Sequence, residues 1–246
     1  MKKGLFTLLA CVLLVSCTEM PEMTQAYTLS VTADKAVASK ALTIDGSGVL
    51  KATWAQGEMV KVIKPSTGDI LGTLTAQGSG QSTTLSGTIS GSINVGNTLR
   101  LEFLSSNYTS QNGLLNEGTA SLDKTCDYAT AEVKVISIDG NTITTQNATF
   151  SNRQAIVKFT LKHGGSLFPV DQMSITVTGT SQSITISVIP PSATSELHVA
   201  IPCYYDSMFS FSIDAVSGET HYPKSIESQT LGNGKYYHYT LNLDSQ

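Results

Sequence analysis

The sequence is poor in charge, cysteine and tryptophan, and each shortage excludes a class of protein. Charged residues make up 14% of the 246 residues, with 15 lysines and arginines against 19 aspartates and glutamates, for a formal net charge of -4. The chain has no basic patch and no basic amphipathic helix, which argues against nucleic-acid binding and against electrostatic docking to anionic lipid. We therefore expect no nucleic-acid partner.

Cysteine is too scarce for a disulfide framework, since the chain has only four. Cys11 lies in the N-terminal apolar run and Cys17 follows that run. Cys126 and Cys203 could form one bridge in an oxidising compartment, but they are far apart in the sequence. Two unpaired, half-buried thiols are the interpretation that we favour.

Motifs that carry chemistry are also missing. The four histidines have no metal-ligand spacing, no Gly-x-Ser-x-Gly elbow is present, and no glycine trio has the spacing of a nucleotide-binding loop. We therefore predict no catalytic residue, no cofactor and no metal site, and we expect that the protein is not an enzyme. A pair of carboxylates assembled in space, as in glycosidases, stays open, because sequence spacing does not test it.

The N-terminus has the parts of a secretory signal: a basic start (MKK), an uncharged apolar run over residues 4–15 and a small-residue exit. The run is shorter than the roughly 20 residues that span a bilayer. Its end, Leu14-Val15-Ser16-Cys17, resembles the lipobox of bacterial lipoproteins. The resemblance implies that residues 1–16 are removed and that Cys17 carries several fatty acyl chains such as palmitate, which together anchor a protein stably. Residues 17–26 would form the lipidated tether.

From Tyr27 onward the sequence alternates apolar and polar residues with period two, which predicts β-strands. The strands are rich in threonine, valine, isoleucine and aromatic residues, and glycine-containing turns separate them. About a dozen short strands at this spacing favour an all-β fold of two tandem β-sandwich domains. We place the domains at residues 27–147 and 148–246. Trp54, the one tryptophan, should be buried in the first domain.

Four segments together resemble the fimbrillin family, the subunits of type V pili in anaerobic Gram-negative bacteria. The first, residues 52–60 (ATWAQGEMV), is similar to a Trp-x-x-Gly-acid-x-aliphatic motif. The second joins a Gln-x-Gly loop at residues 108–113 (YTSQNG) to residues 127–131 (DYATA). The third is residues 148–159 (ATFSNRQAIVKF), and the fourth is residues 197–202 (LHVAIP).

The fimbrillin resemblance implies two transthyretin-like β-sandwiches and assembly by donor-strand exchange. In that process a protease releases the first strand, and a strand of a neighbouring subunit fills the groove. Here the exchanged strand would be residues 27–33, with Tyr27, Leu29 and Val31 on its core face. The only arginines, Arg100 and Arg153, lie inside the fold, so the candidate processing residues are Lys35 and Lys40. The candidate donor strand, residues 236–243, carries alternating apolar positions at Tyr237, Tyr239, Leu241 and Leu243.

Three functions follow from these observations. The first is a fimbrial subunit or adhesin-like structural lipoprotein at the outer membrane surface, with other fimbrial subunits, a host or bacterial surface ligand and the lipid bilayer as partners. The second is a carbohydrate-binding surface lipoprotein of a polysaccharide-uptake system. It requires an exposed aromatic platform, which tyrosines near the C-terminus would supply: Tyr204, Tyr205, Tyr222, Tyr236 and Tyr237. The third, a surface hydrolase, is disfavoured by the missing motifs.

Overall fold

The computed structural model describes residues 25–35, 43–44, 50–51, 53–103, 108–115, 121–203 and 208–244. Within these ranges the regular secondary structure is almost entirely strand, and the single helix is the short α1 (Leu122–Thr125). The all-β prediction is therefore confirmed. No helix in these ranges is long and apolar enough to cross a bilayer. The predicted signal, Cys17 and Lys40 lie outside the described residues.

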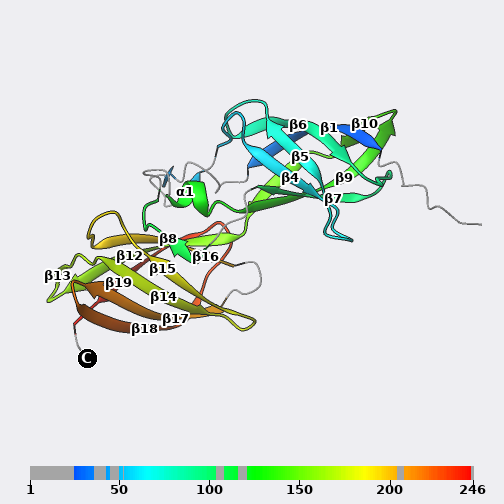
Figure 1. The fold of residues 1–246 in the computed structure, drawn as a ribbon. Coiled ribbons are helices and arrows are strands. Elements are labelled where there is room, and N and C mark those ends of the chain that lie inside the picture. Colours follow the sequence, from blue (N-terminus) through cyan, green and yellow to red (C-terminus); the bar gives the residue numbers. More distant parts are fainter. Residues whose placement is uncertain are drawn as a thin grey trace, which may run out of the picture.

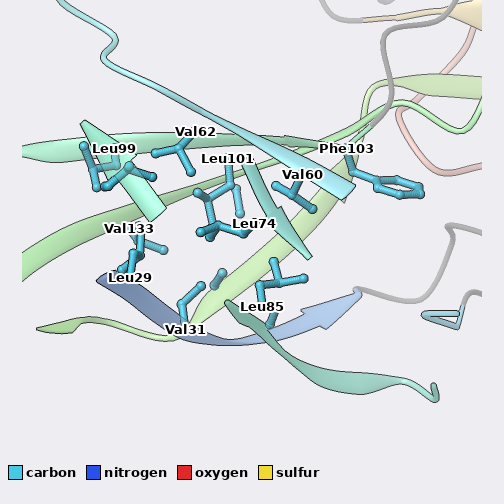
Figure 2. Packing of buried hydrophobic residues seen from close by; sticks show 14 of the residues in the cluster. Leu29, Val31, Val60, Val62, Leu74, Leu85, Leu99, Leu101, Phe103 and Val133 are labelled. Carbon is cyan, nitrogen blue, oxygen red and sulfur yellow. The ribbon is translucent and has the colours of Figure 1, made fainter. Parts of the chain in front are cut away.

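The first half of the chain forms an eight-stranded sheet around one apolar core (Figures 1 and 2). The strand order is β10-β1-β11-β9-β7-β4-β5-β6, and β1 also pairs with β6, so the pairings close on themselves. A sandwich of two separate sheets was expected here, and the difference arises because β1 pairs with strands on both of its sides. The strands are β1 (Ala26–Lys35), β4 (Met59–Ile63), β5 (Ile70–Ala76), β6 (Ser82–Ser90), β7 (Thr98–Phe103), β9 (Ala129–Asp139), β10 (Thr142–Thr145) and β11 (Ala148–Asn152).

Two further sheets, built from the second half of the chain and the short strand β8 of the first half, enclose a second apolar core. One sheet has the order β13-β12-β16, with β19 also paired to β12, and the other has the order β18-β17-β14-β15-β8. Strands from both sheets contribute side chains to this core. The strands are β8 (Ser110–Gln111), β12 (Gln154–His163), β13 (Ser166–Leu167), β14 (Gln172–Thr178), β15 (Ser183–Val188), β16 (Glu196–Pro202), β17 (Met208–Ser217), β18 (Thr220–Thr230) and β19 (Tyr236–Asn242).

The first core ends and the second begins later in the chain than the predicted boundary between residues 147 and 148. Strand β11, which follows that boundary, pairs with β1 and β9 of the first sheet. Phe150 on β11 is fully buried in the first core, whereas Ala155 on β12 belongs to the second core. The sequence pattern missed this because β11 and β12 are separated by Arg153 alone, without a turn signal. Two further short strands, β2 (Thr43–Ile44) and β3 (Leu50–Lys51), pair with each other.

Both described cysteines are unpaired and buried. Cys126 belongs to a small third cluster with Tyr108, Leu122, Ile156 and Ala200. Cys203 belongs to the second core. Burial raises the pKa of each thiol to about 11, so both are poor nucleophiles at neutral pH. The interpretation of two unpaired thiols is confirmed, and neither is a reactive site.

Candidate functional site

Strand β1 is an internal strand of the first sheet, although it lies at the start of the described chain. It runs antiparallel to β6 over nine residue pairs, from Ala26 opposite Ser90 to Asp34 opposite Ser82. On its other side it runs parallel to β10 and then to β11. Both rows of its backbone hydrogen-bonding groups therefore face neighbouring strands. Removing β1 would expose paired backbone groups on each side of the gap, which is the template that an added strand recognises.

The core face of β1 is the one that the period-two pattern predicted. Tyr27, Leu29 and Val31 are all buried in the first core, and the residues between them are exposed. The burial pattern continues through Ala33 to Lys35, so the strand extends two residues beyond its predicted end at residue 33. Without β1, the first core would have an apolar trough, which ends at the position that the Lys35 side chain now fills.

Trp54 contacts both the end of β1 and other residues of the first core. Its side chain is 1% exposed, which confirms the predicted burial. Its indole Nε1–H donates a hydrogen bond of 3.1 Å to the backbone carbonyl of Ala33. Its ring meets Phe103 and Phe150 edge to face, with centroid distances of 5.4 and 5.2 Å. The tryptophan of the first resembling segment therefore contacts both β1 and the aromatic residues of the first core.

Lys35 occupies a charged cage at the end of β1. Its Nζ lies 3.1 Å from Oε2 of Glu58, and the two side chains are 0% and 7% exposed. The same ammonium lies 4.1 Å from the ring centroids of both Trp54 and Phe103. It also donates a hydrogen bond of 3.3 Å to the carbonyl of Thr53. The attraction of the ammonium to the carboxylate and to the two ring faces is strong here, because little water screens it.

This placement corrects the expectation that a protease reaches Lys35 in the folded protein. Lys35 was named as a candidate processing residue beyond a strand of residues 27–33, but it is the last residue of β1 and its side chain is buried. A protease must hold an extended, accessible segment, so β1 would have to leave the sheet before this bond is cut. The second candidate processing residue, Lys40, lies outside the described residues.

The Gln-x-Gly loop and the fourth resembling segment contact each other. Gln111 is buried, and its side chain both donates to the carbonyl of Ala200 and accepts from the N–H of Ala200, each at 2.9 Å. Gly113 has a φ of 73°, and a Cβ there would lie 2.5 Å from the side chain of Leu197. Its carbonyl accepts a hydrogen bond of 2.8 Å from the N–H of His198. These residues attach the loop to β16.

The candidate donor strand is part of the second core. Strand β19 pairs in parallel with β12, with Tyr237 opposite Val157 and Leu241 opposite Leu161. Leu241 and Leu243 are buried, and Tyr237 and Tyr239 pack against the same core as partly buried residues. To enter a neighbouring subunit, this strand would have to leave its own sheet.

The tyrosines named for a sugar-binding platform are separated by the structure. Tyr222 lines a pocket of about 670 Å³ with His163, Lys224 and Leu243. Its ring contacts Phe168, at a centroid distance of 5.2 Å. Tyr236 and Tyr237 do not line this pocket and pack as partly buried residues against the third cluster and the second core respectively. Tyr204 and Tyr205 lie outside the described residues.

The histidines form no metal centre in the described part of the chain, where no three His, Cys, Asp or Glu side chains gather suitably. His198 lies on β16, close to Tyr236. Burial, assisted by the nearby Lys158 cation, lowers its pKa to about 4, so it is neutral at pH 7. Its Nε2 lies 3.3 Å from the hydroxyl of Tyr236. Burial also raises the pKa of Tyr236.

The part that two residues play in the cage was not predicted from the sequence. Lys35 was named as a processing residue, and Phe103 was not singled out. The sequence did indicate that Lys35 faces the core. Residue 35 lies on the same face of an extended strand as Tyr27, Leu29 and Val31. The aromatic partners carried no such signal, since they come from strands far apart in the sequence.

Comparison with known proteins gives fold likeness only. No family model matches the chain, and no curated protein matches its sequence. Solved structures similar to it include a candidate cell adhesion protein from Bacteroides ovatus, with 11% identity, coverage of 88% of this chain and 92% of that chain, and a TM-score of 0.45. A second candidate cell adhesion protein, from Bacteroides uniformis, has 9% identity, coverage of 91% and 94%, and a TM-score of 0.44.

A fimbrial assembly protein from Parabacteroides distasonis has 8% identity, coverage of 88% and 92%, and a TM-score of 0.42. All three proteins come from Bacteroides or Parabacteroides species and are described by adhesion or fimbrial assembly. With TM-scores below 0.5, these likenesses carry no argument about what this chain does.

Proposed function

We propose that this chain is a fimbrial-subunit or adhesin-like lipoprotein of the cell surface, and that it accepts a strand from a neighbouring subunit in place of β1. The observation that carries the proposal is the position of β1, which pairs on both sides yet is the first described strand. One cut after it would free the strand together with everything before it. The lipobox-like sequence ending at Cys17 supports the lipid anchor in the outer membrane.

The groove that β1 would leave should bind a replacement strand favourably. Fully burying a side chain such as Leu29 or Val31 contributes roughly 1.5–3 kcal/mol each. A subunit without β1 would expose the apolar core surface that these side chains cover. It would also expose the backbone groups of the strands on both sides of β1. Exposed strand edges of this kind bind other strands readily. A neighbouring subunit that supplies a matching strand would therefore be held tightly.

The finer fold proposal is that of two tandem β-sandwich domains after the tether. The two sheets over one core in the second half support it directly. In the first half, the closed pairing follows from the presence of β1, and its removal would separate β6 from β10 and β11. The candidate donor named from the sequence, residues 236–243 of another copy, would first have to release β19 from β12.

Strand exchange can be tested on the full-length chain purified in detergent. A site-specific protease sequence is inserted after residue 37, and the nicked protein is incubated in mild urea with a fluorescent peptide of residues 25–37. We expect the N-terminal fragment to leave and the peptide to co-elute with the protein in size-exclusion chromatography. The uncut protein is the control and should not take up the peptide. A nicked protein that keeps its own fragment and excludes the peptide contradicts the proposal.

A second candidate function, carbohydrate binding, is favoured by the pocket beside Tyr222. Its lining combines an aromatic ring with polar groups from Lys224 and His163, the usual elements of a sugar site. The ring of Tyr222 already contacts Phe168 and His163, which leaves less of it for a ligand. Binding of oligosaccharides to wild-type protein and to Tyr222→Ala, measured by calorimetry, separates this function from strand acceptance.

A further inference from the structure

We infer that the cage around Lys35 is a specificity pocket: once β1 has left, it accepts only an incoming strand that carries a cation at the position of Lys35. This inference rests on the proposed strand exchange and names the chemistry of the partner. The strand should bear apolar residues at four alternating positions, ending in a small one, and a lysine two residues later. Tyr27, Leu29, Val31, Ala33 and Lys35 define that pattern in β1 itself.

The groups that would remain after β1 leaves are fixed by other strands and turns. Glu58 immediately precedes β4, Phe103 ends β7, and Trp54 forms a backbone bridge with Gly80. Trp54 and Phe103 are each 1% exposed, and their rings flank the position of the ammonium. The carboxylate and both ring faces thus come from the accepting subunit. The cation is the part of the site that arrives with the strand.

A neutral residue at this position would leave the Glu58 carboxylate in the core without the ammonium that now pairs with it. Removing one member of a buried ion pair is strongly unfavourable, because the remaining charge keeps its desolvation cost and loses its Coulomb partner. The two rings add to the preference, since the face of an aromatic ring attracts a cation. The apolar positions of a strand give affinity, whereas this position discriminates between strands.

The register of an incoming strand would be fixed by the same cage. A shift of one residue moves every side chain to the opposite face, and a shift of two residues moves the cation out of the cage. Because Thr28, Ser30 and Thr32 are exposed, the outer face of the strand offers no comparable selection. A single buried charge at the end of an otherwise apolar trough therefore specifies one alignment.

The candidate donor strand of this chain lacks the required cation. When Tyr237, Tyr239, Leu241 and Leu243 are aligned with the apolar positions of β1, the position of Lys35 is taken by Ser245. The cage therefore predicts that residues 236–246 of a second copy are a poor ligand for this groove. The fitting partner is a subunit whose strand follows the pattern of β1, including its lysine.

The test uses the nicked full-length protein and a fixed amount of the fluorescent 25–37 peptide. Unlabelled competitors are the wild-type peptide, its Lys35→Met variant, the double variant Lys35→Met with Thr32→Lys, and a peptide of residues 236–246. The double variant restores the net charge at an exposed position. We expect the Lys35→Met, double-variant and 236–246 peptides each to require at least about 100-fold more peptide for half displacement.

The outcomes are distinct for the cage and for strand exchange. Equal competition by the wild-type and Lys35→Met peptides, or recovery by the exposed lysine, overturns the cage while strand exchange stands. Failure of even the wild-type peptide to enter overturns strand exchange and the cage with it. A nicked Glu58→Gln protein should lose most of its preference for the lysine peptide. The peptide comparison stands without this variant if the variant does not fold.

Discussion

Lys35 and Glu58 form an ion pair of 3.1 Å between Nζ and Oε2, and both side chains are almost completely excluded from solvent. We predict that Lys35→Met lowers the free energy of unfolding by about 3–5 kcal/mol, because the Glu58 carboxylate stays buried and loses the Lys35 ammonium. The double variant Lys35→Met with Glu58→Met should recover most of this loss, since it removes both members of the ion pair. Urea denaturation followed by circular dichroism measures both.

The ion pair between Lys158 and Glu196 provides a matched control. Its Nζ–Oε1 distance is shorter, at 2.8 Å, but the side chains are 22% and 49% exposed. Water screens such a pair, so Lys158→Met should change the stability by less than about 1 kcal/mol. Similar losses at Lys35 and Lys158 would show that burial of the Lys35 pair has no energetic consequence.

Trp54 should be a main contributor to the stability of the first core. Truncation of a buried tryptophan to alanine typically costs about 3–5 kcal/mol, and we expect Trp54→Ala to fall in this range. Trp54→Phe should cost less, because it keeps a ring between Phe103 and Phe150 and loses mainly the hydrogen bond to Ala33. Chemical denaturation measures both variants. A loss below about 1 kcal/mol for Trp54→Ala would contradict the packing described here.

The alternation of residues 27, 29 and 31 predicted both the strand and its buried face, because period two is a local property of the backbone. The closure of the first sheet was not predictable in the same way. It depends on β1 pairing with β6 and β11, which are distant in sequence and carry no mark of their partner. The cage shows the same limit. Lys35 and Glu58 are both polar, and only the three-dimensional pairing shows that they neutralise each other in the core.

Gln111 should stabilise the contact between its loop and β16. Gln111→Ala would leave both the N–H and the carbonyl of Ala200 without the amide that they bind, and both groups are buried. Each buried polar group left unsatisfied costs about 1–3 kcal/mol, so we expect a loss of at least about 1 kcal/mol in urea denaturation. Gln172→Ala is the control, because Gln172 is exposed on β14. Equal small effects of the two variants would contradict the role of Gln111.

Cys17 should be the only site of lipid attachment. Cys17→Ala removes the thiol that the lipobox resemblance assigns to acylation, so the precursor should retain residues 1–16 and take up no label from a radioactive fatty acid. Cys11→Ala is the matched control, because it removes a cysteine of the same signal without touching the exit sequence. Labelling and electrophoretic mobility measure the result. Label in the Cys17→Ala protein would contradict the lipoprotein proposal.

His198 should make the stability depend on pH in mildly acidic solution. Burial, together with the Lys158 cation, lowers its pKa from 6.5 to about 4 in the folded protein. Above pH 6.5 the side chain is neutral in both states and contributes no pH dependence. Between pH 6.5 and 4 the unfolded chain binds a proton that the folded protein does not. Stability should therefore fall as the pH falls through this window, by up to roughly 3 kcal/mol.

The His198→Gln variant isolates this contribution, because glutamine does not titrate and keeps a polar group near the Tyr236 hydroxyl. Its unfolding free energy should fall less than that of the wild type between pH 6.5 and 4, even if its stability at pH 7 is lower. His221→Gln is the control, since His221 lies exposed on β18, where its Nδ1 contacts Asp214. Parallel pH profiles for wild type and His198→Gln would show that this histidine is protonated in the folded protein as easily as in the unfolded chain.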